Sequence, residues 1–314
     1  MEKLHNLLAC PNCKYDLKIN NDNAFCSNET CRHHKLPFSK FQNKFVLVDF
    51  NKSILKSSSI SEDVNLELVQ RNQTSNTVRK ALRRVLNGSP NISKCNFQKA
   101  LSVVKLDHTL RILIIGGGTI GEGLDEFYSN YKDSIISFDV YNSINVDFIA
   151  DAHSIPLKSN SIDLIIIQAV LEHVFNPTEV VDECYRVLKS DGVIYAETPF
   201  LQGVHEGAYD FTRYSVLGHR ILFKKFLATE TGVIGGAGVS LLWSIEYFFR
   251  GLFRSVLIGK FFKAIFIWIR WLEKLIPEKY NIDGACGSYF IGIKQDNIIE
   301  LQPWEYLQDY KGAQ

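Results

Sequence analysis

Between positions 111 and 200 the sequence alternates between short apolar runs and helical patterns. The apolar runs are RILIIG (111–116), SIISFDV (134–140), VDFIAD (146–151), IDLIIIQAV (162–170) and GVIYAETPF (192–200). Strands that alternate with helices form βαβ units, and these build a parallel sheet. We therefore predict an α/β fold, in which residues 177–192 form a helix that stops at Asp191-Gly192.

A glycine-rich turn follows the first of these runs. Gly116, Gly118 and Gly121 satisfy the spacing G-x-G-x-x-G, and such a turn lets backbone N–H groups approach a ligand closely. Asp139 ends the second run, where a carboxylate can accept hydrogen bonds from both hydroxyls of a ribose. NAD and S-adenosylmethionine both carry an adenosine ribose, so these features predict a nucleoside cofactor without choosing between the two.

The motifs that follow separate the two cofactors. Asp151-Ala152 comes after the third run, then IPLKSNSIDLIIIQAVLEHV, and then RVLKSDGVIYAE. This order resembles class I S-adenosylmethionine-dependent methyltransferases, in the branch that carries D-A-x-x-[IL]-P, S-[FI]-D, L-E-H-V and R-V-L-K-x-G-G. The chain departs from the family's G-x-G-x-G turn at Ile120, where the last glycine usually stands; Gly121 would take that role with a shift of one residue.

The resemblance implies a Rossmann-like sheet that is mostly parallel, with one antiparallel late strand for which residues 287–295 are the candidate. It also implies that S-adenosylmethionine is held at its methionine end by the glycine turn, at its ribose and adenine by the aspartates, and near its amino acid group by a glutamine. The residues implied are Gly116, Gly118, Gly121, Asp139, Asp151, Ala152 and Gln168.

Short-chain dehydrogenases are the rival family, because they share the glycine turn and need Y-x-x-x-K. Tyr185 and Lys189 match that string. However, they precede the fifth strand, whereas the tyrosine of that family follows it, and the family's N-A-G after strand four is replaced by Gln168-Ala169-Val170. We therefore interpret Tyr185 as a packing residue of a helix.

The loop after the fifth strand carries the candidate chemistry of the methyl acceptor. Ligands of open α/β sheets bind beyond the carboxyl ends of the strands, and the loop 198–215 concentrates titratable and aromatic residues there. Its pattern H-x-x-x-x-D-x-x-R resembles methyltransferases of bacterial cell-surface saccharide and secondary-metabolite pathways. The resemblance implies that His205 is a general base or orients the acceptor, and that Asp210 and Arg213 fix the loop and the substrate, partly through a mutual ion pair. The alternative is a salt-bridged loop without a catalytic role.

His173 comes just after strand four. It either packs at the start of a helix or contacts the substrate, and the sequence favours neither role.

Four cysteines near the N-terminus, Cys10, Cys13, Cys26 and Cys31, predict a structural Zn²⁺ site. The C-x₂-C of CPNC is a typical zinc knuckle, although the second pair is more widely spaced. His33 or His34 could replace Cys31 as a ligand, and four ordinary buried thiols are the alternative to a metal site. A short segment cannot bury a core unaided, so a metal would supply the folding energy of a module at 1–50.

Residues 51–107 are predicted to form a helical linker region, with an amphipathic helix around Glu62–Leu86. It contains the densest basic cluster of the chain, Arg79–Arg84. That cluster is either a solvated helix face or, as the sharper alternative, a phosphate-contacting patch. The methyltransferase domain is expected at 108–314.

That domain contains an insert at about 239–280. Its segment 239–276 is apolar and rich in aromatic residues, but basic residues interrupt it throughout. Because no uncharged stretch is long enough to span a bilayer, a membrane crossing is not expected. Its charged residues fall on two helical stripes that change phase near Gly259, which predicts two helices joined by a bend. The stripes consist of Glu246, Arg250 and Arg254, and of Lys260, Lys263, Arg270 and Lys274. Three interpretations compete: a cap against the sheet or a homodimer partner, an interfacial membrane contact, and a lid over a lipid-linked acceptor.

The sequence as a whole predicts a methyltransferase that uses S-adenosylmethionine for in-line transfer to a small-molecule, saccharide or lipid-linked acceptor. Net charge is +1 and no export signal is evident, which predicts a cytoplasmic protein, with the insert as the candidate contact to the inner face of the membrane. A ribosomal RNA base methyltransferase is the first alternative, because a zinc knuckle ahead of this fold resembles bacterial guanine methyltransferases; the near-neutral charge argues against nucleic acid. The second is a catalytically inactive interaction protein.

Overall fold

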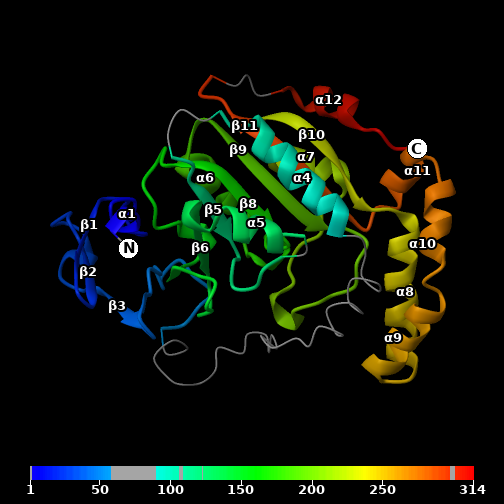
Figure 1. Cartoon of the computed structure of the whole chain (residues 1–314), viewed down its shortest axis with the longest axis horizontal. Helices are drawn as coiled ribbons and strands as arrows, with labels where there is room; N and C mark the ends of the chain where they lie inside the picture. The colour runs from blue at the N-terminus through cyan, green and yellow to red at the C-terminus, as the bar shows by residue number, and fades with distance from the viewer. Residues whose placement is uncertain (1, 58–89, 106–108, 122, 298–300) are drawn as a thin grey trace.

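The computed structural model describes residues 2–57, 90–105, 109–121, 123–297 and 301–314. A seven-stranded sheet with helices on both faces forms the body of the molecule, and a four-stranded sheet precedes it (Figure 1). The helix predicted around Glu62–Leu86 and the basic cluster Arg79–Arg84 lie outside the described residues.

The large sheet has the order β10-β11-β9-β8-β5-β6-β7. Its parallel strands are β5 (Ile112–Ile115), β6 (Ile135–Asp139), β7 (Phe148–Ile149), β8 (Ile162–Gln168) and β9 (Leu188–Pro199). The late strand β11 (Gly287–Lys294) runs antiparallel to both of its neighbours, β9 and β10 (Phe226–Gly235). The predicted Rossmann-like sheet with one antiparallel strand is confirmed.

Helices cover both faces of this sheet, which explains why its central strands are continuous apolar runs rather than alternating ones. On one face α4 (Pro90–Val103) and α5 (Asp125–Asn130) pack together, and the ring of Phe97 meets Tyr195 of β9 edge-on at 4.6 Å. On the other face lie α6 (Pro177–Val187) and α7 (Val216–Leu222). A short helix, α12 (Pro303–Tyr306), follows β11.

The helix predicted at 177–192 is shorter than expected, because α6 ends at Val187 and β9 begins at Leu188. Leu188 is fully buried and pairs with Ile162, so the sheet takes up the residues that the helical pattern would have continued. Asp191 adopts a left-handed φ of 62° within β9 instead of ending a helix. Tyr185 packs as interpreted, with its ring 5.4 Å from that of Phe226.

The N-terminal module consists of α1 (Glu2–His5) and the antiparallel strands β1 (Leu17–Asn20), β2 (Asn23–Cys26), β3 (Phe38–Phe41) and β4 (Lys44–Phe45). It docks on the edge of the large sheet, where Leu47 N donates to the Ile149 carbonyl at 2.8 Å. Lys14 Nζ also lies 2.8 Å from Glu183 Oε2 of α6. One apolar core runs through both parts.

The predicted division of the chain at positions 50 and 107 stays a prediction. Within the predicted linker region, α4 packs directly on the large sheet.

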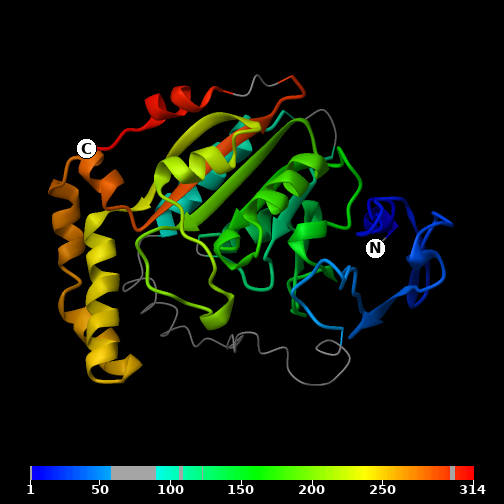
Figure 2. The same ribbon diagram turned by 180° about the vertical axis from the view of Figure 1, so that it is seen from behind.

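The predicted insert lies between β10 and β11 and projects from the sheet as a helical hairpin (Figure 2). Its elements are α8 (Ala237–Leu252), α9 (Val256–Ile265), α10 (Ile269–Leu272) and α11 (Glu278–Asp283). The bend comes at residues 253–255, earlier than the predicted Gly259. Gly259 instead lies where the two helices pack closely, since a Cβ there would lie 2.6 Å from the Glu246 carbonyl oxygen.

A buried ion pair joins α8 to α9. Lys263 Nζ lies 2.8 Å from Glu246 Oε2, their side chains are 1% and 8% exposed, and Lys263 Nζ lies 3.9 Å from the centre of the Trp243 ring. These two residues were expected on separate polar stripes, but they face each other between the helices. No helix in the described part of the chain is long and apolar enough to cross a membrane.

We expect Lys263→Met to lower the free energy of unfolding by about 3 kcal/mol, because it leaves the Glu246 carboxylate buried without its partner. The double variant Glu246→Leu/Lys263→Met should recover most of this loss, since it removes both charges. Urea unfolding followed by circular dichroism measures the three values.

Lys260→Met is the matched control, because Lys260 is an exposed lysine of the same helix, and its effect should stay within about 0.5 kcal/mol. A Lys263→Met variant as stable as this control would show that the pair does not hold the hairpin together.

Candidate functional site

The glycine turn after β5 lies at the carboxyl edge of the parallel strands, and its glycines are required by close contacts. Gly116 has a left-handed φ of 75°, and a Cβ there would lie 2.3 Å from Val170. A Cβ on Gly118 would lie 2.4 Å from the ring of Tyr141. Larger residues would therefore force the side chains of Val170 and Tyr141 to move.

Asp139, at the end of β6, is bound to this turn. Gly118 N donates to Asp139 Oδ2 at 2.8 Å, and Val140 N donates to Oδ1 at 2.7 Å. Gly121 lies against Gln168 at the end of β8, because a Cβ there would be 1.8 Å from Gln168 Oε1. Ile120 is 39% exposed. The turn thus brings Gly121, and not Ile120, to the position that closes on Gln168.

The Asp151 carboxylate after β7 is already held by two neighbours. Its Oδ1 accepts hydrogen bonds from the backbone N of His153 at 2.9 Å and from His153 Nδ1 at 2.6 Å, while the Ser53 hydroxyl donates to Oδ2. Burial alone would raise the pKa of Asp151, but these hydrogen bonds hold it below its usual value. Ser53 was not anticipated from the sequence, because it comes from a segment far away in the chain. Ala152 beside it is buried.

Glu197 near the end of β9 is a second residue that the sequence analysis missed. It is 4% exposed, and it accepts hydrogen bonds from Ser93 of α4 and from Gln168 Nε2, each at 2.7 Å, and from the Tyr195 hydroxyl. Burial raises its pKa against the effect of these donors. The signal in the sequence that could have identified Glu197 is its position as an acidic residue within an apolar strand. Its effect is to orient Gln168.

The loop between β9 and α7 contains the expected ion pair. Asp210 and Arg213 form a two-pronged contact, with Arg213 Nη2 2.6 Å from Asp210 Oδ2, and His205 N donates to the same oxygen at 2.8 Å. Burial opposes ionisation of Asp210, but these donors hold its pKa below the usual value. Asp210 therefore fixes the backbone of the loop at His205.

His205 faces a pair of residues that follow β8, Glu172 and His173. The Nε2 atoms of His173 and His205 lie 3.2 Å apart, and Glu172 Oε1 lies 3.6 Å from each of them. The Glu172 carboxylate, by its contact with the ring and then by its charge, raises the pKa of His205, although burial opposes that shift. His173 Nδ1 contacts the Tyr209 carbonyl oxygen at 2.8 Å, so His173 packs against the loop that carries His205, and its role in binding a substrate stays a prediction.

Backbone strain accumulates at the same edge of the sheet. Ala169, directly after β8, has a φ of 52°, and Glu206, directly after His205, has a φ of 63°. Non-glycine residues adopt these values where the surrounding structure imposes them, and such residues cluster at functional sites. Both strained residues adjoin side chains of the site, Gln168 and His205.

The four N-terminal cysteines converge on one point. Cys10 Sγ lies 3.9 Å from Cys31 Sγ, Cys13 Sγ lies 3.3 Å from Cys26 Sγ, and all four sulfurs lie within 4.8 Å of one another.

The two histidines considered as alternative ligands are engaged elsewhere. The ring of His33 stacks on Phe38 with centroids 4.0 Å apart, and His34 Nδ1 contacts the Cys26 carbonyl at 3.0 Å. Cys31, and not a histidine, completes the cluster of side chains.

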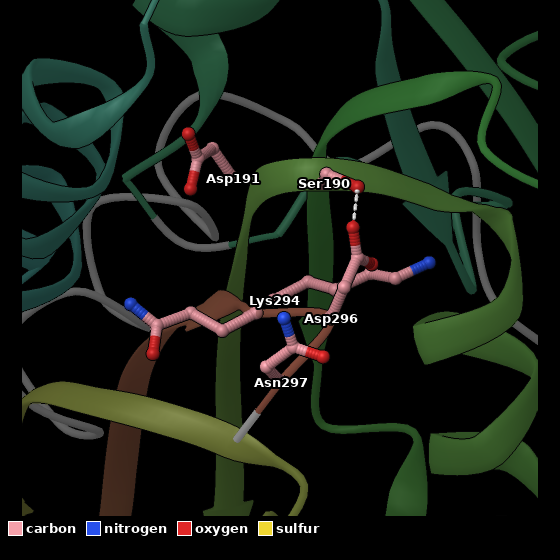
Figure 3. Close-up of a pocket in the computed structure, with 6 residues that line it drawn as sticks. Ser190, Asp191, Lys294, Asp296 and Asn297 are labelled. Atoms are coloured by element: carbon pink, nitrogen blue, oxygen red, sulfur yellow. Dashed lines mark hydrogen bonds between the residues drawn. The ribbon is translucent and has the colours of Figure 1, made fainter.

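A surface cavity of about 380 Å³ lies at the opposite edge of the sheet, where β9 begins and β11 ends (Figure 3). It is lined by Ser190, Asp191, Lys294, Gln295, Asp296 and Asn297. In Figure 3 the hydroxyl of Ser190 points to the carboxylate of Asp296, to which it donates a hydrogen bond. The cavity contains none of the predicted site residues, so it is separate from the site at the carboxyl edge.

Residues 127–196 match the family described as "Methyltransferase domain". The match runs from α5 through β9 and includes Asp139, Asp151, Glu172 and His173. A search of curated proteins gives no match.

Several solved structures share similarity with the chain. A SAM-dependent methyltransferase from Archaeoglobus fulgidus is 15% identical, with 69% of this chain and 99% of that chain covered and a TM-score of 0.41. The phosphoethanolamine N-methyltransferase 2 of Haemonchus contortus is 18% identical, with 72% and 59% covered and a TM-score of 0.41. The [4+2]-cyclase SpnF is 14% identical, with 66% and 82% covered and a TM-score of 0.40.

Proposed function

Because this chain carries a methyltransferase domain, we propose that it binds S-adenosylmethionine at the carboxyl edge of β5, β6 and β8 and methylates an acceptor beside the loop that carries His205. The observation that carries the proposal is the hydrogen bond from Gly118 N to Asp139 Oδ2. It places a carboxylate against a glycine turn at the point where α/β sheets bind nucleotide-like ligands. The cofactor supplies a methyl group on a positively charged sulfonium.

The residues at this edge fit such a cofactor. The glycine turn lets the backbone come close, the Asp139 carboxylate is suited to the ribose hydroxyls, and Gln168 is oriented by Glu197 toward the region of the amino acid group. Asp151 and Ala152 would lie at the adenine, where the two bonds from His153 and the one from Ser53 orient the carboxylate.

Methyl transfer is an in-line displacement: the acceptor atom forms a bond to the methyl carbon while the carbon–sulfur bond breaks and its electron pair stays on sulfur. Most of the rate can come from alignment of the acceptor. A hydroxyl acceptor must also lose its proton, to a base or to water. We assign to His205 the alignment of the acceptor or the removal of this proton, and to Asp210 and Arg213 the positioning of His205.

The helical hairpin supports a lipid-linked acceptor over a freely soluble one. Its exposed residues are strongly apolar, among them Phe248, Leu252, Leu257, Phe261 and Trp271, which are 62–79% exposed. Exposed apolar patches of this kind mark interaction surfaces.

The charge of the hairpin complements an anionic lipid surface. The exposed charged residues over 237–275 are basic: Arg250, Arg254, Lys260 and Lys274. Both acids within 237–275 are engaged, since Glu246 pairs with Lys263 and Glu273 accepts from the backbone N of Gly236 and of Val239; Glu278 of α11 is exposed. Aromatic and basic side chains together are typical of interfacial helices.

The hairpin is also tied to the acceptor loop. The hydroxyl of Tyr247 in α8 donates to the carbonyl of Val204, the residue before His205, and a Cβ on Gly203 would lie 2.5 Å from the Tyr247 ring. A lipid surface at the hairpin would therefore present a lipid-linked acceptor to the loop, at the inner face of the membrane.

For the four cysteines we propose a structural Zn²⁺ ion. Zinc–sulfur bonds of about 2.3 Å in a tetrahedron separate the sulfurs by about 3.8 Å, close to the observed 3.3 and 3.9 Å. Amide groups support the thiolates, since Asn28 N donates to Cys26 Sγ at 3.4 Å and Asn12 Nδ2 to Cys31 Sγ at 3.6 Å. Four protein ligands leave no open position for a substrate.

Calorimetric titration with S-adenosylmethionine tests the cofactor site. We expect saturable binding that Asp139→Asn weakens about tenfold or more, because the variant loses the charge that accepts from the ribose hydroxyls. Asp133→Asn, an exposed aspartate just before β6, is the control and should bind as the wild type does. Absence of any binding by the folded wild-type protein would favour the inactive interaction protein.

His205→Ala should leave the affinity for S-adenosylmethionine unchanged while it lowers turnover about a hundredfold or more. Turnover is followed as S-adenosylhomocysteine released with lipid-linked and free saccharide fractions. Unaltered turnover would remove His205 from the mechanism.

Metal analysis of the purified protein tests the cysteine site. We expect about one zinc per chain, lost in Cys26→Ser together with a fall in melting temperature, because the sulfurs form part of the apolar core of the module. Cys95→Ser changes an exposed cysteine of α4 and should keep both the zinc and the melting temperature. Zinc retained in Cys26→Ser would place the ion elsewhere.

Sedimentation with vesicles tests the hairpin. The wild type should pellet with vesicles of phosphatidylcholine and phosphatidylglycerol, and Leu257→Ser/Phe261→Ser should weaken this binding more than tenfold, since each side chain contributes about 1.5–3 kcal/mol when buried. Leu36→Ser/Ile144→Ser, a pair of exposed apolar residues off the hairpin, is the control. A wild type that never pellets, with a concentration-dependent dimer in solution, would assign the hairpin to self-association instead.

A further inference from the structure

Glu172 carries a carboxylate whose burial is not explained by hydrogen bonding. Its side chain is 1% exposed, and among the described residues neither carboxylate oxygen has a hydrogen-bond partner. A buried charge is normally paired and hydrogen-bonded, or it coordinates a metal. Glu172 Oε1 instead lies 3.6 Å from Nε2 of His173 and 3.6 Å from Nε2 of His205.

The three side chains have the spacing of ligands on one ion. Metal bonds of about 2.0–2.2 Å to imidazole nitrogen and carboxylate oxygen in a tetrahedron place neighbouring ligand atoms about 3.3–3.6 Å apart. The observed separation of the two Nε2 atoms is 3.2 Å. The rings meet edge to face, with an angle of 86° between their planes, and the ligand atoms of all three residues lie within 4.8 Å of one another.

The Nδ1 atom of His173 is also arranged as in a metal site, where the ring nitrogen away from the ion contacts a carbonyl or a carboxylate. A carbonyl oxygen can only accept, so the contact of 2.8 Å to Tyr209 O requires a proton on His173 Nδ1, and the neutral ring then has its lone pair on Nε2. Behind His205, Nδ1 lies 3.5 Å from Asp210 Oδ2, which can only accept, and 3.5 Å from Arg213 Nη2, which can only donate.

We propose that Glu172, His173 and His205 bind a divalent transition-metal ion, distinct from the zinc of the four cysteines. Two imidazoles and one carboxylate favour ions such as Fe²⁺, Co²⁺ or Zn²⁺ over Mg²⁺ and Ca²⁺, which prefer oxygen ligands. Three protein ligands leave coordination positions open. Their place between the end of β8 and the loop after β9 directs them to the acceptor side of the proposed cofactor site.

This inference deepens the proposed function, and its use in catalysis rests on that function. An ion at this point would take an oxygen of the acceptor, so the acceptor would be a hydroxyl or carboxylate compound able to act as a ligand. It would also decide between the two roles of His205. With Nε2 bound to the ion, His205 orients the acceptor through the metal and does not itself remove a proton.

The competing occupant of the centre is a proton. If His205 is an imidazolium, its Nε2–H can point to His173 Nε2 and to Glu172, which would satisfy the cluster without a metal. The two occupants differ in what removal of the carboxylate does. A metal site loses its ion in Glu172→Gln, whereas a proton-bridged pair of histidines has no metal affinity to lose.

Titration of zinc-loaded protein with Co²⁺, followed by visible absorption, tests the site. We expect saturation near one equivalent of Co²⁺, with ligand-field bands but without the charge-transfer absorption of a cobalt–thiolate bond. Glu172→Gln and His205→Ala should weaken this binding at least tenfold. Glu179→Gln, an exposed glutamate of α6, is the control and should bind as the wild type does.

Melting temperature gives a second readout that does not depend on activity. Co²⁺ should raise the melting temperature of the wild type and of Glu179→Gln but not that of Glu172→Gln, since only a folded site binds the ion. Glu172→Gln removes an unpaired buried charge, so it should fold without metal. No uptake of Co²⁺ beyond the zinc, or equal uptake by Glu172→Gln, overturns the metal site and favours the proton. Because neither readout uses S-adenosylmethionine, failure here leaves its binding titration unaffected, and failure of that titration leaves this result standing.

Discussion

Parallel pairing of β8 with β5 on one side and β9 on the other brings three loops to the same edge of the sheet. Parallel strands all end at one edge, so residues separated by more than eighty positions, such as Gly121 and His205, lie on loops at the same edge of the sheet. The strands are buried on both faces by helices, which leaves this edge as the place where polar side chains can gather. The glycine turn, Asp139, Gln168 and the histidine cluster all depend on that arrangement.

Buried carboxylates organise this edge in two different ways. Glu197 is surrounded by donors and serves to orient Gln168. Glu172 has the same degree of burial but no donor among the described residues, and it faces two imidazoles instead. The first arrangement is complete within the protein, and the second calls for an ion or a proton. The contrast supports assigning the cofactor to the side of Gln168 and the acceptor to the side of Glu172.

The two appendages approach the domain from different sides. The N-terminal module shares its apolar core with the large sheet, and the segment that directly follows the module reaches Asp151 through Ser53. The helical hairpin contacts the acceptor loop through Tyr247. One appendage thus touches the proposed adenine end of the site and the other its acceptor end, so both can influence the site without containing its residues.

The sequence by itself determined the five strands β5 to β9 and the late strand β11, the glycine turn and the four-cysteine cluster, because these depend on local periodicity and short spacings. It also predicted the contact between Asp210 and Arg213, which lie three positions apart. Tertiary structure alone decided the rest. The end of α6 at Val187 follows from pairing of Leu188 in the sheet, and Lys263 meets Glu246 only because α9 folds back on α8. Ser53 on Asp151, Ser93 on Glu197 and His205 on Glu172 join distant segments, and no local pattern encodes which distant side chain will reach a buried carboxylate.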